Sequence, residues 1–326
     1  MDQLIADFSD HLREALAISI TFSVENSKTF DNVVITGLGG SGIGGKIVSD
    51  IITSEVNIPV ICNNDYTLPN FAGKNTLLIA ASYSGGTEET LEALEKGLKK
   101  GCTCAIVSSG GKAIEIAQEK NIPHIVIPGG FPPRAAFGYS FVQLFAILHA
   151  FGVCSIDRVE AIDKAIELLD TEEENIKTIA KEVAAKLHKN QAVIYSSFAF
   201  EGVSTRFRQQ LNENSKILTW HHCIPEMNHN ELVGWAGGDS NYAVVNFMNP
   251  EDHFKTKERF RISKEIISKY TQNITDLTPK GENLLEYSLY FIHLGDWISY
   301  ELSVLNKVDP VEVNVITHLK DELSKL

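Results

Sequence analysis

The sequence has no apolar run close to the roughly 20 residues that a membrane-spanning helix requires. It also lacks the regularly spaced, even set of cysteines of a disulfide-stabilised domain, because its five cysteines lie mostly within apolar stretches. Nor is there a surplus of positive charge: the net charge is −13. These absences argue against nucleic acid or a membrane as a partner, and they predict a cytoplasmic protein with reduced thiols.

The first 17 residues carry acidic side chains early and show no cleavage site, which predicts an amphipathic helix docked on the protein rather than a signal peptide. The length of 326 residues suits two domains of average size. Within 30–150, short β-branched runs alternate with helical stretches, a pattern typical of a parallel sheet covered on both faces. The expected strands are 32–36, 58–62, 76–81, 103–107 and 124–127, and the expected helices are 88–100, 112–120 and 135–151.

The charged stretch 157–190 predicts a solvated linker of two helices, with Asp170 or Thr171 capping the second. Beyond it the alternation of strands and helices returns less regularly. The expected strands there are 192–196, 217–219 and 242–246, and the expected helices are 204–214, 258–270, 284–305 and 310–326. We therefore predict an α/β protein of two doubly wound units, residues 1–153 and 154–326, each a parallel sheet flanked by helices.

A glycine-rich loop, VVITGLGGSGIGG at 33–45, stands between the first expected strand and a helix. Its glycines permit positive φ angles and a close approach to a ligand, while the helix start offers unpaired N–H groups, so the loop predicts an anion site. Gly37-x-Gly39-x-x-Gly42 also matches the dinucleotide fingerprint, with Asp65 near the end of the second strand as the ribose contact. From this loop alone both ligands remain open.

A second loop, SYSGGTEET at 82–90, follows the third strand and contains three hydroxyl side chains, Ser82, Ser84 and Thr87. Hydroxyls beside the N–H groups of a helix start form a suitable cage for a phosphomonoester. Helix capping accounts for one of these hydroxyls but not for all three. The second loop therefore favours a phosphorylated ligand over a dinucleotide.

The order strand–GGSG–helix followed by strand–SxSGxT–helix resembles the SIS (sugar isomerase) domain. Further segments resemble the bifunctional phosphoglucose/phosphomannose isomerases of that superfamily, in one order over nearly the whole chain. These segments are GLGGSGIGG (37–45), SYSGGT (82–87), PPRAAFGYS (132–140), QLNENSK (210–216), PEMNHNELVGW (225–235) and THLKDEL (317–323). One departure is Gly86, which stands where the loop of the family usually reads Asn. The resemblance implies two flavodoxin-like SIS domains.

The resemblance also implies a role for each residue at the reacting end. Glu213 is expected to move the proton between C1 and C2, because aldose–ketose isomerisation needs a base. His229 is expected to open the sugar ring and to reach the site from a partner subunit. Arg134 would balance the charge of the enediolate, and Lys320 would assist, with Lys307 as the rival lysine.

Gly40, Ser41 and the three hydroxyls of the second loop are expected to bind the substrate and its phosphate. The implied activity is metal-independent and cofactor-free isomerisation of glucose 6-phosphate, and of mannose 6-phosphate, to fructose 6-phosphate by a homodimer. A metal site is disfavoured, because the His and Cys residues between 221 and 229 lack metal-ligand spacing: His221, His222, Cys223, Glu226 and His229. The alternatives are a non-catalytic phosphosugar-binding protein and an NAD-dependent oxidoreductase.

Overall fold

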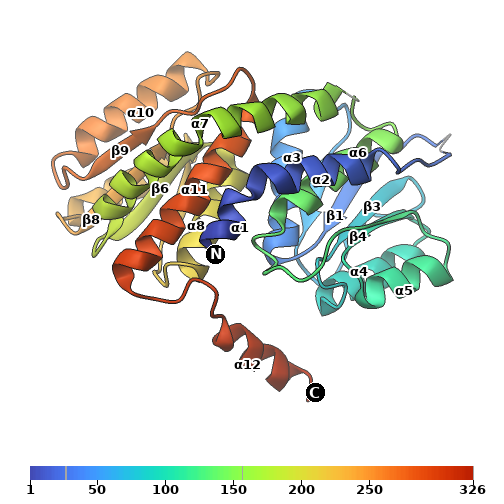
Figure 1. Ribbon diagram of the computed structural model, residues 1–326. Coiled ribbons are helices and arrows are strands. Elements are labelled where there is room, and N and C mark those ends of the chain that lie inside the picture. The colour runs from blue at the N-terminus through green and yellow to red at the C-terminus, as the bar shows by residue number, and fades with distance from the viewer. Residues whose placement is uncertain (26–27, 156, 326) are drawn as a thin grey trace.

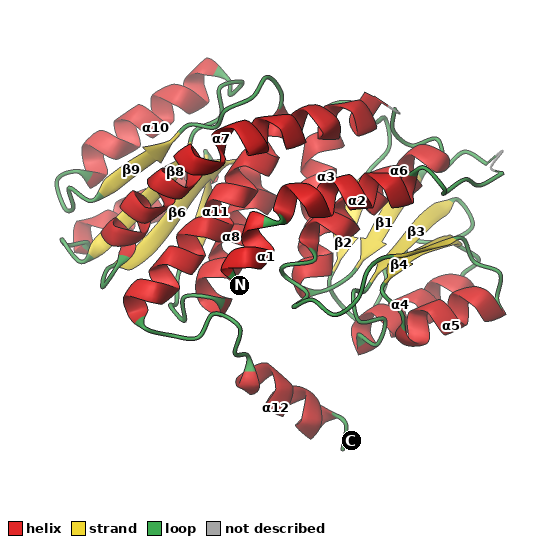
Figure 2. Ribbon diagram, viewed as in Figure 1, coloured by secondary structure: helices red, strands yellow, loops and turns green. Residues whose placement is uncertain are grey.

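The computed structural model describes residues 1–25, 28–155 and 157–325, and it contains two separate parallel sheets (Figures 1 and 2). The first sheet has the strand order β2-β1-β3-β4-β5, which is the order of a doubly wound flavodoxin-like fold. Its strands are β1 (Asn32–Thr36), β2 (Val60–Asn63), β3 (Thr76–Ala81), β4 (Thr103–Ser108) and β5 (His124–Val126). The predicted strands of this half are thereby confirmed to within a few residues.

Helices cover both faces of the first sheet. On one face lie α4 (Glu88–Lys99) and α5 (Gly111–Glu119), and on the other lie α3 (Gly39–Ile52) and α6 (Phe137–Ala150). The N-terminal segment forms α1 (Asp2–Ala6) and α2 (Phe8–Ser19), and it buries an apolar face against the body as expected.

The second sheet repeats the first with one strand fewer, in the order β7-β6-β8-β9. Its strands are β6 (Gln191–Ser197), β7 (Trp220–Ile224), β8 (Tyr242–Phe247) and β9 (Ile274–Leu277). The strand predicted at 217–219 is wrong, because β7 begins only at Trp220 and pairs with β6 as far as Ile224. Strand β9 was not predicted, since ITDL at an edge is short and only half apolar.

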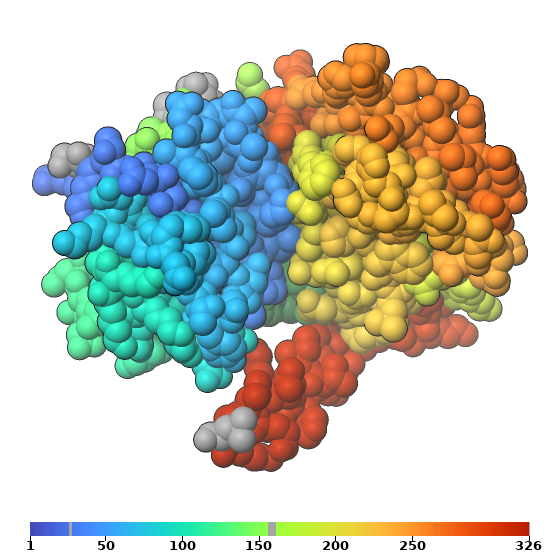
Figure 3. All heavy atoms as spheres, turned by 180° about the vertical axis from the view of Figure 1, so that it is seen from behind, coloured from blue at the N-terminus to red at the C-terminus, as the bar shows by residue number. Residues whose placement is uncertain are grey.

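Helices of the second half are α7 (Asp157–Leu187), α8 (Glu201–Glu213), α9 (Glu231–Gly234), α10 (Phe254–Ile267), α11 (Leu284–Asn306) and α12 (Asn314–Leu323). Three short 3₁₀ turns join them, η1 (Phe198–Phe200), η2 (Glu226–His229) and η3 (Trp235–Gly237). Helix α12 buries no residue and projects away from both halves, as Figures 1 and 3 show. It begins at Asn314 rather than at Pro310, which corrects the expected proline-led start.

The expected two-helix linker is wrong, because 157–187 form the single helix α7. The hydroxyl of Thr171 donates to the carbonyl oxygen of Glu167 (2.8 Å) and Asp170 pairs with Arg13, so neither residue caps a helix there. The apolar residues of this stretch recur at helical spacing, and α7 packs along α11. They are fully or almost fully buried: Ile162, Ala165, Ile166, Leu169, Ile176, Ala180, Val183, Ala184 and Leu187.

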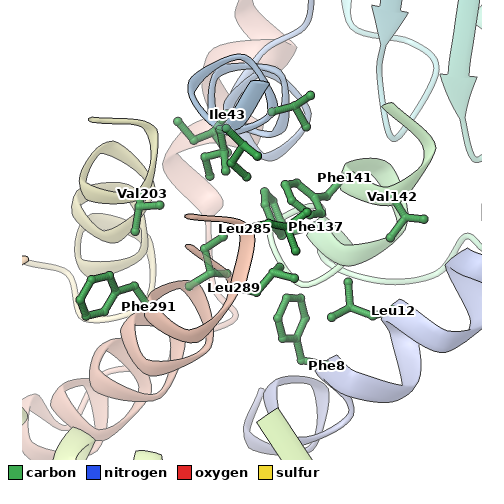
Figure 4. Packing of buried hydrophobic residues seen from close by; sticks show 14 of the residues in the cluster. Phe8, Leu12, Ile43, Phe137, Phe141, Val142, Val203, Leu285, Leu289 and Phe291 are labelled. Carbon is green, nitrogen blue, oxygen red and sulfur yellow. The ribbon is translucent and has the colours of Figure 1, made fainter. Parts of the chain in front are cut away.

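One hydrophobic core runs through both halves. In Figure 4, Phe8 and Phe137 of the first half face Leu285 and Leu289 of α11 in the second half. This shared core holds the loops of the first sheet and the helices of the second in fixed relative positions. Within the described ranges, no helix combines the length and the apolar content needed to cross a membrane. The five cysteines are unpaired.

Candidate active site

The first glycine loop leads into α3 without a side-chain cap. Leu38 occupies the N-cap position and makes no capping bond, so the first N–H groups of this helix point out unpaired by any side chain. Gly39 has a φ of +54°, which favours glycine. A Cβ atom at Gly40 would lie 3.0 Å from the carbonyl oxygen of Pro133, so this glycine allows the loop to approach the segment that carries Arg134.

The second loop repeats this arrangement at α4. Thr87 takes the N-cap position, yet its hydroxyl accepts a hydrogen bond from Ser82 (2.9 Å) instead of capping the helix. The hydroxyl of Ser84 accepts weakly from the N–H of Gly86 (3.3 Å). Gly85 has a φ of +67°, and a Cβ there would collide with a neighbouring carbonyl oxygen 1.8 Å away. The tight turn therefore places the hydroxyls of Ser82 and Thr87 in contact at the start of α4, with the Ser84 hydroxyl beside Gly86.

Direct hydrogen bonds join the two loops to each other and to the segment before α6. The N–H of Tyr83 donates to the hydroxyl of Ser41, at 3.0 Å. The phenol oxygen of Tyr83 in turn accepts from the N–H of Phe131 at 2.9 Å. Both loops are thus fixed against the chain that leads to Arg134.

Arg134 lies in a turn before α6 and is only 5% exposed. Its Nη1 lies 3.2 Å from Oε2 of Glu213, the last residue of α8, and its Nε donates to Oδ1 of Asn214 at 2.6 Å. Burial lowers the pKa of the Arg134 guanidinium from its ordinary value, and the Glu213 carboxylate opposes that shift. The structure therefore brings together two residues that the sequence places 79 positions apart.

A buried polar network supports this pair, and sequence reasoning did not single out its members. The amide of Asn214 donates to the hydroxyl of Ser299 on α11 (2.9 Å). Asp296, one turn earlier, accepts from Arg206 and Gln210 of α8, both at 2.7 Å. The polar residues within the otherwise apolar α11 were the available signal, because buried polar groups need partners.

The chain before α12 also belongs to this site. The guanidinium of Arg134 donates to the carbonyl oxygens of Pro310 and Val311. Lys216, another residue that was not predicted, donates to the carbonyl oxygen of Glu312 at 2.7 Å. The chain that leads into α12 is therefore held beside Arg134, although Lys320 itself lies exposed on that helix.

His229 is exposed at the end of η2 and makes no hydrogen bond to Arg134 or Glu213 within the described residues. The two histidines of β7, His221 and His222, have hydrogen-bond partners outside this site. Nε2 of His221 lies 2.9 Å from the hydroxyl of Thr205, and Nδ1 of His222 lies 2.8 Å from the Glu231 carboxylate.

No group of three His, Cys, Asp or Glu side chains converges as metal ligands in the ranges that the structure describes. Asp65, the ribose contact of the oxidoreductase alternative, accepts from the N–H of Tyr66 at 2.6 Å and from the hydroxyl of Thr67 at 3.3 Å. That carboxylate therefore stabilises its own turn.

Comparison with known proteins decides between the alternatives. A bifunctional phosphoglucose/phosphomannose isomerase of Caldicellulosiruptor bescii is 34% identical over 337 aligned positions, which cover 100% of this chain and 99% of that protein. The chain belongs to this isomerase family. A second member, from Thermoplasma acidophilum, is 35% identical with 91% of each chain covered. The family described as bacterial phospho-glucose isomerase C-terminal SIS domain matches residues 176–323.

The fold agrees with this membership. The structure of the C-terminal domain of glucosamine-fructose-6-phosphate aminotransferase from Francisella tularensis superposes with a TM-score of 0.76 at 14% identity, covering 94% of this chain and 96% of that one. The predicted pair of doubly wound SIS units is confirmed. Membership in the isomerase family also weighs against the oxidoreductase and the non-catalytic binder.

Proposed function

We propose that this enzyme reversibly converts glucose 6-phosphate, and also mannose 6-phosphate, into fructose 6-phosphate through a cis-enediolate. The observation that carries the proposal is the Arg134–Glu213 pair, at 3.2 Å, with Arg134 on a segment that Gly40 of the first loop approaches closely and that Tyr83 of the second loop contacts at Phe131. A phosphate anchor next to a carboxylate and a fixed positive charge meets the needs of proton transfer beside a phosphorylated chain. Membership in the family supports the same reaction.

The two glycine loops hold the phosphate and the sugar in this proposal. Gly40 and Ser41 offer the start of α3, and the hydroxyls of Ser82, Ser84 and Thr87 surround the start of α4. Helix N-termini favour anions because their N–H groups are unpaired and the helix dipole is positive there. This source of charge is local, so it is compatible with a net charge of −13 on the whole chain.

In the reaction itself, His229 opens the ring and Lys320 assists. Glu213 then removes the proton from C2 and returns it to C1, while Arg134 balances the negative charge of the enediolate. Rotation about the C2–C3 bond of the enediolate lets the same carboxylate address either face, which gives both epimers. Lys307 remains the rival to Lys320.

A homodimer completes the site in this proposal. His229 is exposed, and among the described residues no hydrogen bond joins it to Glu213. Such a position suits a residue that acts on a neighbouring subunit. We place the domain boundary between residues 153 and 154, just before the long helix α7, and we place the enzyme in the cytoplasm. It uses no metal or cofactor.

Glu213→Gln tests the proposal, because the amide keeps the shape of the side chain but cannot take a proton. Turnover of fructose 6-phosphate should fall by about 1,000-fold, within the usual range for losing a general base. Binding of 6-phosphogluconate should persist, and EDTA should leave the wild-type rate unchanged. Glu174→Gln, at a carboxylate 88% exposed on α7, is the matched control. Undiminished turnover in the Glu213 variant would exclude this residue as the base.

A further inference from the structure

A charged cluster ties the two halves together through side chains that are not themselves proposed to touch the substrate. Nζ of Lys46 on α3 lies 2.5 Å from Oδ1 of Asp50 and 2.7 Å from a carboxylate oxygen of Glu201, the first residue of α8. The other oxygen of Asp50 accepts from the N–H of Gly202 at 2.9 Å. We call Lys46, Asp50, Glu201 and Gly202 the α3–α8 joint.

Each carboxylate oxygen of Asp50 contacts a different partner in this joint. The N–H of Gly202 is one of the first of α8 and has no partner within the helix, so Asp50 of the first half acts as the missing cap. Oδ1 meanwhile holds Lys46, which also reaches Glu201. The side chain of Asp50 is only 11% exposed, so water competes little for either contact.

The backbone at Gly202 shows how close this contact is. A Cβ atom there would lie 2.7 Å from Cγ1 of Ile47, 2.9 Å from Oδ2 of Asp50 and 3.0 Å from the backbone nitrogen of Ile47. Only glycine allows α8 to lie at this distance from α3. Gly202 lies inside α8, where it serves helix packing.

The two helices of the joint carry the two ends of the site. Helix α3 begins with the first glycine loop, and α8 ends with Glu213. Lys46 and Glu201 line the same cleft as Gly39 and Gly42. From Gly202 to Glu213 a helix extends about 16 Å, so a small rotation of α8 at the joint displaces the carboxylate at its far end.

We propose that Asp50 is a positioning residue, which fixes α8 against α3 and so sets Glu213 relative to the phosphate-binding loops. This proposal rests on the proposed function, since it assumes that Glu213 moves the proton. A displacement of about 1 Å in a reacting group can cost about 100-fold in rate, so the joint acts on turnover rather than on substrate binding.

Asp50→Asn tests the proposal, because an amide has a single acceptor oxygen and cannot serve both Lys46 and the N–H of Gly202. We expect kcat to fall by about tenfold, with the KM for fructose 6-phosphate and the Kd for 6-phosphogluconate each within about twofold of wild type. Asp276→Asn is the matched control. Asp276 lies on the edge strand β9 and is ion-paired to Lys264 of α10 (2.6 Å), so this variant should leave kcat unchanged.

Stability separates positioning from folding in this test. Burial raises the pKa of Asp50 from 3.8 to about 6, so the folded protein prefers the protonated carboxyl and loses stability as the pH rises through that window. A neutral amide removes that cost but also loses the ion pair with Lys46, so the two effects oppose each other and the melting temperature at neutral pH should change little. A lower kcat with an unchanged or higher melting temperature therefore supports positioning, whereas an unchanged kcat overturns it.

A pH profile gives a second readout. The titratable groups that interact with Asp50 are Lys46 on α3, Glu201 on α8, Cys62 on β2 and Cys223 on β7. Protonation of Asp50 weakens its hold on Lys46, so the ratio of wild-type to Asp50→Asn kcat should fall from about ten near pH 7.5 to about two near pH 5. Groups common to both enzymes cancel in this ratio. A ratio that stays near one at every pH overturns the proposal.

A second variant approaches the joint from α8. Gly202→Ala pushes α8 away from Ile47 and should lower kcat by at least as much as Asp50→Asn, while 6-phosphogluconate still binds. Glu213→Gln is measured alongside both. A wild-type enzyme without isomerase activity, or an active Glu213→Gln, refutes the proposed function itself. An active wild type with an inactive Glu213→Gln and an unaffected Asp50→Asn refutes only the positioning role.

Discussion

The phosphate-binding end of the candidate site and its ring-opening end differ in how far one chain completes them. At the first end, Ser41, Tyr83 and Arg134 are buried and linked by hydrogen bonds or close backbone packing. At the second end, His229 and Lys320 are exposed, and no described residue holds either of them against Glu213. A preorganised anchor is therefore combined with catalytic groups that have to be supplied by movement or by a second subunit.

This difference has a physical origin in the two kinds of element. The anchor lies at the carboxyl ends of parallel strands, where a twisted sheet and its helices leave little freedom. Helix α12 buries nothing, and His229 ends a single 3₁₀ turn, so their positions depend on what packs against them. Activity should accordingly be more sensitive to changes at the first end than at the second.

The largest effect should come from Arg134→Met, which removes every polar contact that the Arg134 side chain makes in the phosphate-binding end. Nε and both Nη nitrogens of Arg134 contact Asn214, Glu213 and the carbonyl oxygens before α12. We expect kcat/KM to fall by about 1,000-fold, the upper range for loss of one charge-stabilising group. Arg261→Met, at an arginine 54% exposed on α10, is the control. A loss below tenfold would show that the contact between Arg134 and Glu213 is dispensable for catalysis.

A mixing experiment tests whether the ring-opening end lies on a second chain. His229→Ala and Glu213→Gln should each lower kcat by at least about 100-fold when assayed alone. Mixed subunits that exchange should regain about a quarter of wild-type activity, because half of the dimers then carry one intact site. Activity that stays at the level of the single variants after proven subunit exchange would place His229 and Glu213 on the same chain.

The strand–loop–helix geometry of the two glycine loops could be predicted from the sequence alone, because local chemistry determines it. Glycine loops between a strand and a helix, with hydroxyls beside the helix start, define Ser82 and Thr87 without tertiary information. The pairing of Arg134 with Glu213 came only from the resemblance to a family. It spans two sheets, and no local pattern encodes it.

The errors of prediction arose where tertiary packing outweighs local pattern. The charged stretch at 157–190 looked like a solvated linker, yet one apolar stripe commits α7 to the core against α11. The sequence analysis missed Asn214, Arg206 and Asp296 because these residues act through hydrogen bonds between α8 and α11. Such buried networks become visible only when both helices are in place.

Substitutions at the adjacent glycines Gly85 and Gly86 test whether the turn of the second loop shapes the phosphate site, and their expected effect is smaller. Gly85→Ala forces a Cβ into a carbonyl oxygen 1.8 Å away and should raise the KM for fructose 6-phosphate by about tenfold through displacement of the hydroxyls. A Cβ at Gly86 would meet nothing within 4 Å, so Gly86→Ala should stay within about twofold of wild type. Gly86→Asn, the residue usual in the family, should also be tolerated. Equal KM values for Gly85→Ala and Gly86→Ala would show that the turn does not shape the phosphate site.

The smallest effect should separate the two candidate lysines. Lys307 ends α11 with a φ of +56°, whereas Lys320 lies on α12, whose start is held by Arg134 and Lys216. At 1.5 Å per residue, Lys320 is about 9 Å along the helix from Asn314, so a hinge at that start could bring it to the sugar. Lys320→Ala should lower kcat by about fivefold, since Lys320 only assists His229, while Lys307→Ala should not change it. The reverse order would assign the lysine to the anchored body of the enzyme and remove α12 from the site.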